Sequence, residues 1–78
     1  MDDQELLARI HELVEEEHRL ESGQDALGPD DEERLHRLEV ALDQCWDLLR
    51  QRRARRKAGL DPDTAAVRPE STVEGYAQ

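Results

Sequence analysis

Residues 35–57 read LHRLEVALDQCWDLLRQRRARRK, an apolar stripe at helical spacing followed by a run of basic residues. Apolar residues that recur at steps of three and four form one face of an α-helix. Here the stripe consists of Leu35, Leu38, Leu42, Cys45, Trp46 and Leu49. Acidic residues follow Pro29, where they suit the positive end of a helix dipole, and Gly59 is a suitable left-handed cap. The stretch therefore predicts a long helix over residues 30–57.

A shorter helix is predicted before it, over residues 3–21. Asp2 is a good N-cap residue, and Glu5 follows three positions later, as in a capping box. The apolar residues of this segment also return at steps of three and four, as Leu6, Ile10, Leu13, Val14 and Leu20. Ser22 and Gly23 then end the pattern.

The loop between the two helices, about residues 22–29, has the length that joins antiparallel neighbours. We therefore expect an all-α fold. It consists of an antiparallel two-helix hairpin, coiled-coil-like, over residues 1–59 and an extended C-terminal tail over residues 60–78. Asp61, Pro62 and Asp63 allow one short helical turn in the tail, and Pro69 argues against further helix beyond it.

In such a hairpin, facing residue numbers should sum to about 51. Leu13 then faces Leu38, and the first helix ends where Leu49 begins. The same rule places Glu17, at the centre of the apolar stripe, opposite Arg34. Two arrangements remain open: a partly buried Glu17–Arg34 ion pair that fixes the register, or a Glu17 side chain that extends into water at the open end near the loop. Residues 50–57 are left to project beyond the paired region.

Those residues carry the strongest charge cluster of the chain. Residues 1–49 have a net charge of −12, residues 50–57 of +6 and residues 58–78 of −3. The basic residues are Arg50, Arg52, Arg53, Arg55, Arg56 and Lys57. Three interpretations remain open: a solvated helix end, contact with nucleic-acid phosphates, and docking on an acidic protein surface. The net charge of −9 and the lack of interleaved aromatic residues weigh against nucleic acid, so we expect an unidentified protein partner.

The tail has its own residues with which to cover this cluster. Leu60, Val67, Val73 and Tyr76 are apolar, and the acidic residues of the tail are suited to pair with some of the arginines. We expect the tail to fold back over the basic segment on this ground.

A homodimer is expected because the chain has no Phe, one Trp and one Tyr, which leaves little apolar surface for a stable two-helix core. Leu7 and Trp46 lie beside the seam and not at its centre, so they are the residues expected at the contact between copies.

The candidate chemical groups do not form a recognisable active site. Two Glu-x-x-His units occur, ending at His18 and His36, but their ligands do not converge within one hairpin. His11 and His18 share a helix face and offer a metal site only across an interface between copies. Cys45 lies on the apolar stripe without an activating neighbour, which favours a structural thiol. We therefore expect a protein that is not an enzyme and has no cofactor.

The remaining features indicate the cell compartment. No apolar run exceeds three residues, the N-terminus begins Met1-Asp2-Asp3, and a lone cysteine cannot form an internal disulfide. We expect a cytoplasmic protein that does not span a membrane.

Four segments resemble a small actinobacterial family catalogued as a domain of unknown function. They are residues 8–18 (ARIHELVEEEH), residues 42–54 (LDQCWDLLRQRRA) and the tail segments VRP (67–69) and VEGY (73–76). The resemblance covers nearly the whole chain. It implies a bacterial, cytoplasmic source and transfers no activity.

Overall fold

The computed structural model describes residues 2–23 and 28–73, and within these ranges the protein contains helices and no strand. The all-α prediction is confirmed. The elements are α1 (Asp3–Glu21), α2 (Pro29–Lys57), the short 3₁₀ helix η1 (Pro62–Thr64) and α3 (Glu70–Val73).

The start of α1 is fixed by the capping box expected from the sequence. The Glu5 backbone N–H donates to Oδ1 of Asp2 at 2.8 Å, and the Asp2 backbone N–H donates to Oε1 of Glu5 at 3.3 Å. Each residue thus satisfies a backbone donor that the first helical turn leaves unpaired.

The end of α2 is fixed by a glycine with positive φ. Gly59 has φ +77°, its N–H donates to the Arg56 carbonyl at 3.1 Å, and the Leu60 N–H donates to the Arg55 carbonyl at 2.8 Å. This pair of bonds is a Schellman motif, which turns the chain sharply out of the helix. The segment that follows is thereby directed back along α2.

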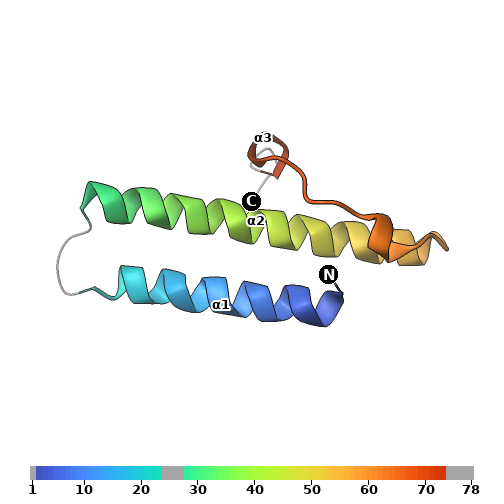
Figure 1. The fold of residues 1–78 in the computed structure, drawn as a ribbon, viewed down its shortest axis with the longest axis horizontal. Helices are drawn as coiled ribbons and strands as arrows, with labels where there is room; N and C mark the ends of the chain where they lie inside the picture. Colours follow the sequence, from blue (N-terminus) through green and yellow to red (C-terminus); the bar gives the residue numbers. More distant parts are fainter. Residues whose placement is uncertain (1, 24–27, 74–78) are drawn as a thin grey trace.

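Helices α1 and α2 lie side by side and run in opposite directions (Figure 1). One core cluster contains Ile10, Leu13, Leu38 and Leu42, and a second contains Leu6, Leu48 and Leu49. The expected end of the pairing was wrong, because Leu49 is only 1% exposed and packs with Leu6. The contact between the helices reaches further along α2 than a constant sum of residue numbers allows.

The Glu17–Arg34 pair, one of the two arrangements considered for Glu17, was also wrong. Nε of Arg34 donates to Oε1 of Glu16 at 3.0 Å instead. Arg34 is exposed, so the pair forms on the flank of the helix pair and not in the seam. Glu16 is the better placed partner there, because neighbouring residues on a helix differ by about 100° in direction.

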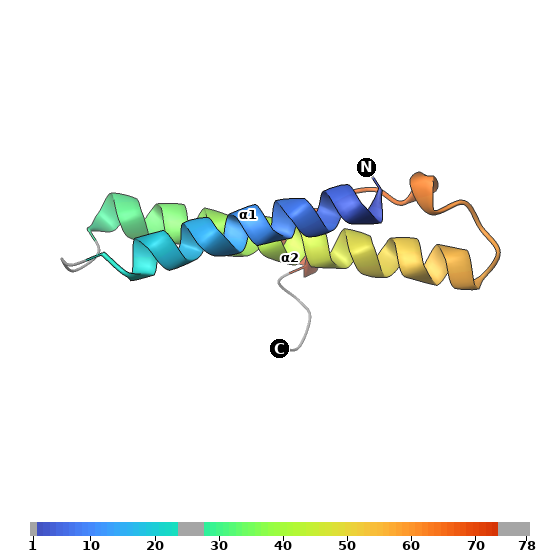
Figure 2. The same ribbon diagram turned by 90° about the horizontal axis from the view of Figure 1, so that it is seen from below.

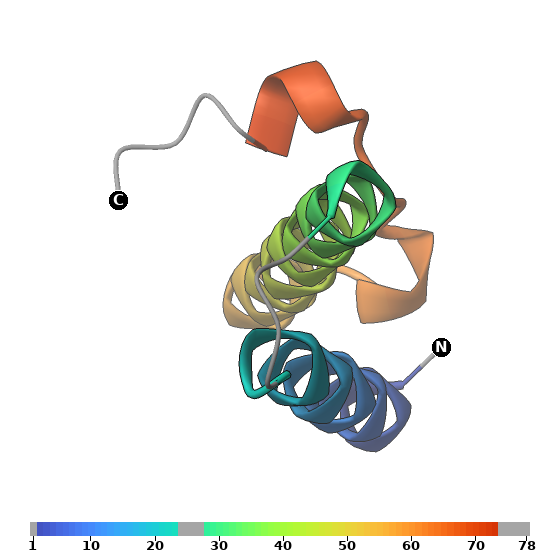
Figure 3. The ribbon, with the colours of Figure 1, turned by 90° about the vertical axis from the view of Figure 1, so that its left-hand side faces the viewer.

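The tail passes back along α2 and contacts it through both η1 and α3 (Figure 1). Seen along the helix axes, η1 lies on one flank of the helix pair and α3 lies on the side of α2 away from α1 (Figure 3). Helix α3 corrects the expectation of no helix after Pro69. The Pro69 carbonyl accepts from the N–H of Thr72 and Val73, and a proline is tolerated where a helix begins because its missing N–H would be unpaired there.

The apolar residues of the tail have different environments. Val73 is fully buried, whereas Leu60 and Val67 are exposed. The expectation for Tyr76 lies outside the described residues. Among the helices described, none is long and apolar enough to cross a lipid bilayer.

Candidate functional site

Arg52 is the centre of an ion-pair cluster where three segments of the chain meet. Its side chain is almost fully buried, at 6% exposed for the residue. Nε donates to Oδ1 of Asp3 at 2.7 Å, and Nη1 donates to Oδ1 of Asp63 at 2.9 Å and to the Pro62 carbonyl at 3.3 Å. One guanidinium thus joins α2 to the start of α1 and to η1.

Asp3 is shared between two arginines of α2. Arg56 also donates to it, from Nη1 to Oδ1 at 3.2 Å and from Nη2 to Oδ2. The hydrogen bonds from Arg56 and Arg52 lower the pKa of Asp3 from 3.8 to about 2. Arg52 likewise lowers the pKa of Asp63, so both acids of this cluster are ionised at neutral pH.

A second ion pair holds the tail further along α2. Asp47 is fully buried, and Arg68 from the tail donates to both of its carboxylate oxygens, with Nε 2.9 Å from Oδ2. Gln51 adds a bond from Nε2 to Oδ2 at 2.8 Å. The buried carboxylate is therefore satisfied by a bidentate guanidinium and an amide, as a buried charge requires.

Other polar side chains on the same side of α2 bind the tail backbone. Nε2 of Gln51 donates to the Ala66 carbonyl at 2.8 Å, and Nε2 of Gln44 donates to the Arg68 carbonyl at 3.2 Å. Near α3, Nε2 of His36 lies 3.2 Å from Oε1 of Glu70. We call the side formed by His36, Gln44, Asp47 and Gln51 the tail face of α2.

The six basic residues expected at a contact surface do not share one environment. Arg52 and Arg56 are engaged by Asp3, so the expectation that the whole segment projects freely was wrong for these two. The physical reason is that α1 begins opposite Arg52 and its first turn presents an acid there. The described parts of the chain contain no ion pair to Arg53, Arg55 or Lys57.

Arg55 and Lys57 lie in the last turn of α2, which continues past the start of α1 (Figure 2). A hollow of about 300 Å³ opens beside them, lined by Gln51, Ala54, Arg55 and Leu60. Leu60 is 57% exposed, so an apolar surface adjoins a guanidinium at this end of the molecule.

Leu7 and Trp46, the expected contact residues between copies, are not part of the internal core. Leu7 is 44% exposed and Trp46 is 42% exposed. Neither is among the residues of the two core clusters. They are large apolar side chains at the surface, which is the state an unpartnered contact surface would have.

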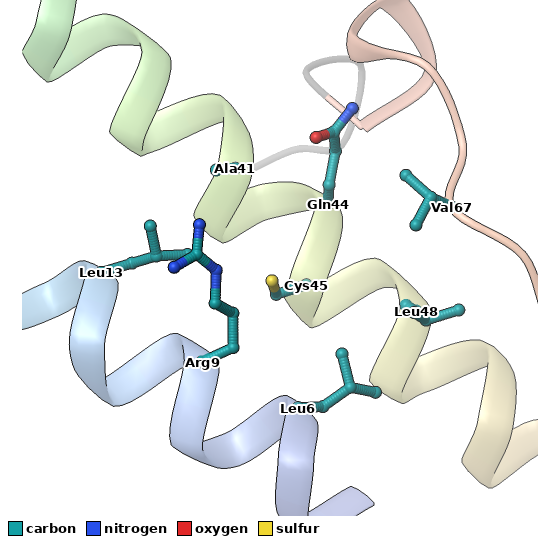
Figure 4. A pocket seen from close by; sticks show the side chains of 8 residues that line it. All are labelled: Leu6, Arg9, Leu13, Ala41, Gln44, Cys45, Leu48 and Val67. Carbon is teal, nitrogen blue, oxygen red and sulfur yellow. The ribbon is translucent and has the colours of Figure 1, made fainter. Parts of the chain in front are cut away.

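Cys45 lies in a shallow apolar groove between the two long helices and the tail. The groove has a volume of about 240 Å³ and is lined by Leu6, Arg9, Leu13, Ala41, Gln44, Cys45, Leu48 and Val67 (Figure 4). Burial raises the pKa of the Cys45 thiol above 9.0, and Arg9 only partly offsets this. The thiol is therefore protonated at neutral pH and is a weak nucleophile.

The histidines singled out for metal binding lie apart. His11 and His18 are exposed on α1, with Nε2 of His11 3.1 Å from Oε1 of Glu15, and His36 contacts Glu70. In the ranges 2–23 and 28–73, no three His, Cys, Asp or Glu residues are grouped to hold a metal ion.

The residues that sequence reasoning missed are Asp47 and Arg68. One signal was available, because Asp47 is the only acid between Gln44 and Gln51, at spacings of three and four residues on one helix face. Arg68 is the single basic residue of an acidic tail.

The comparisons with known proteins show the family. The model of the family described as "Protein of unknown function (DUF2630)" matches residues 2–78. The uncharacterized proteins Mb0922c of Mycobacterium bovis and Rv0898c of Mycobacterium tuberculosis are each 51% identical to this chain over 77 residues. Each match covers 95% of this chain and 88% of the relative. No solved structure matches. The chain belongs to this family of unknown function, as the resemblance of residues 8–18 and 42–54 indicated.

Proposed function

We propose that the protein is a non-enzymatic, cytoplasmic interaction protein in which a coiled-coil-like antiparallel hairpin presents the last turn of α2 to an acidic surface of a protein partner. Arg55 and Lys57 make the charged contacts, and Leu60 adds an apolar one. The observation that carries the proposal is a difference among the basic residues. Arg52 and Arg56 are bound by Asp3, whereas Arg53, Arg55 and Lys57 make no ion pair within residues 2–23 and 28–73.

The surroundings of Arg55 favour a protein partner over a polyanion. Leu60 is exposed beside the guanidinium, and the adjacent hollow of about 300 Å³ accommodates a side chain of a partner. A partner surface that combines a carboxylate with an apolar side chain would fill both features. Nucleic-acid phosphates would use only the charges, and the chain as a whole carries −9.

The experiment is affinity capture from a lysate of an actinobacterium, with the full chain as bait and with nuclease added. An Arg55→Gln/Lys57→Gln variant is compared with wild type and with a matched control, Arg19→Gln/Arg37→Gln. The control removes the same charge from exposed positions far from the last turn of α2. We expect a nuclease-resistant protein partner whose recovery falls about tenfold in the first variant and is unchanged in the control.

Added salt should weaken the capture by wild type, because the contact is made by charges at the surface, the exposed Lys57 and the partly exposed Arg55. Equal recovery by both variants would contradict the proposed surface. Loss of every partner on nuclease treatment would favour the alternative, a factor that binds nucleic-acid phosphates.

A further inference from the structure

Trp46 and Leu7 lie on the same broad side of the helix pair, opposite the groove. The groove is lined by Arg9 of α1 and by Gln44 and Leu48 of α2, among others. Leu7 is two residues from Arg9, and Trp46 is two residues from Gln44 and from Leu48. Two residues correspond to a rotation of about 200° around a helix, so Leu7 and Trp46 point to the other side.

The tail leaves this side uncovered over the described residues. Viewed along the helices, η1 lies on one flank and α3 lies over α2 on the side away from α1, whereas the opposite flank carries neither (Figure 3). The exposed fractions of 44% for Leu7 and 42% for Trp46 agree with this placement. An apolar centre with contributions from both long helices is thus open to solvent.

Charges on α2 are arranged in order on either side of Trp46. Glu39 precedes Trp46 by seven residues and Arg53 follows it by seven, while Asp43 and Arg50 stand three before and four after. Residues that are three, four or seven positions apart lie on the same face of a helix. We call the side formed by Glu39, Asp43, Trp46, Arg50 and Arg53 the Trp46 face. It is acidic towards the start of α2 and basic towards its end.

We infer that the Trp46 face binds a second copy of this chain in antiparallel orientation, with a twofold axis that passes near Trp46. Under this symmetry, the residue seven positions after Trp46 in one copy lies opposite the residue seven positions before Trp46 in the other copy. Arg53 of each copy then lies against Glu39 of the other copy, and both residues are exposed in the single chain. The Leu7 and Trp46 side chains of both copies meet at the axis and bury each other.

The order of the charges favours a second copy of the chain in antiparallel orientation. A parallel arrangement would place Arg53 against Arg53 and Glu39 against Glu39, which is unfavourable. A polyanion would be attracted by one half of the face and repelled by the other. A second copy satisfies both halves, because a twofold interface is made by the same surface in both partners.

The surface goes beyond the proposed function, since Arg55 and Lys57 lie past the apolar centre and are tested separately. Sedimentation equilibrium of the full chain measures the dimer directly, starting from a chain mass of 9.0 kDa. The only tryptophan of the sequence, Trp46, is an internal reporter, and its emission should shift to shorter wavelength as the dimer forms.

Charge reversals test the orientation. Arg53→Glu alone places two carboxylates against each other at both ends of the contact, and Glu39→Arg alone places two guanidinium groups against each other there. Each variant should therefore dimerise at least about 100-fold more weakly than wild type. A mixture of the two variants should form a heterodimer, because an Arg53→Glu chain presents acids at both positions and a Glu39→Arg chain presents bases at both. Its affinity should be near that of wild type. The variant carrying both changes should dimerise with itself.

Val67→Ala, an exposed apolar truncation off this face, should leave the dimer unchanged. Trp46→Ala should weaken the dimer at least about tenfold without loss of helical circular dichroism. Wild type that remains at 9.0 kDa up to millimolar concentration would overturn the inference. Single variants that dimerise normally, or a mixture that fails to recover the dimer, would overturn it too.

Discussion

The tail face and the Trp46 face of α2 contain the same residue types in different environments. On the tail face, Asp47 is fully buried and bound by Arg68. On the Trp46 face, the charged residues Glu39 and Arg53 are exposed and the largest apolar side chain is 42% exposed. Up to residue 73, the tail covers one side with polar contacts and leaves the other side open.

The adjacent arginines Arg52 and Arg53 show the difference most closely. Arg52 points towards the start of α1 and is buried by Asp3 and Asp63, whereas Arg53 is about 100° further round the helix and exposed. A run of basic residues is therefore not one functional unit. The role of each basic residue depends on the groups that the rest of the chain places beside it. Four predictions test this difference between the two sides of α2.

The largest effect is expected where the tail face holds its buried charge. Arg68→Ala leaves the buried carboxylate of Asp47 without its guanidinium and should lower the free energy of unfolding by about 3–5 kcal/mol. Urea denaturation followed by circular dichroism measures the change. The Asp47→Ala/Arg68→Ala variant should be less destabilised than Arg68→Ala, since no unpaired charge remains. A loss no greater than that of Arg37→Ala, an exposed control, would show that the tail face does not hold the tail.

A smaller effect is expected from breaking the cluster around Arg52. Arg52→Gln removes the bonds to Asp3 and Asp63 and should lower the melting temperature clearly. Arg53→Gln changes the same residue type at the next position and should leave the melting temperature of the monomer nearly unchanged. Differential scanning calorimetry at low protein concentration makes the comparison. Equal shifts for the two variants would remove the distinction between the two sides.

The pH dependence of stability should follow the acids that Arg52 and Arg56 engage. The folded-state pKa of Asp3 is about 2, below its ordinary 3.8, so its contribution to stability is present above about pH 4. That contribution is lost as the pH falls from 4 towards 2, and Asp63 acts in the same direction. Melting temperatures between pH 2 and pH 5 should fall less steeply for Asp3→Asn than for wild type. Glu12→Gln, an exposed acid, is the control and should keep the wild-type slope.

The smallest effect concerns Cys45, which reports on the groove that the tail helps to line. Its raised pKa predicts that it reacts with a soluble thiol reagent at pH 8 more slowly than an unstructured cysteine. Because Val67 of the tail borders the groove, Arg68→Ala should speed the reaction. A rate in wild type equal to that of the denatured chain would indicate that the tail and helices do not shield the thiol.

The features predictable from sequence were those with a local cause. Asp2 and Glu5 mark the start of α1 because a capping box is complete within four residues. The apolar steps around Leu38 and Leu42 predict the face that packs, because a helix repeats every 3.6 residues.

The features that were missed depend on residues distant in the chain. Arg52 is buried by Asp3 and Asp63, which are 49 and 11 positions away. The expected pairing of tail acids with some arginines is confirmed by Asp63, but no neighbour of Arg52 signals its contact with Asp3. The pairing rule failed near Leu49 because it assumed one constant register along the whole contact. Pro69 argues against a helix that continues through it, although a proline also suits the start of a helix. For Arg52 and Leu49 a partner distant in the chain determines the outcome, whereas the helix after Pro69 has a local cause.

The central claim is that the tail is a fixed part of the fold and thereby divides α2 into a covered and an open side. Backbone ¹⁵N relaxation of the wild-type protein tests it most directly. The account predicts order parameters near 0.85 for residues 62–73, equal to those of α2. Values below about 0.6 for these residues, with α2 still rigid, would contradict it.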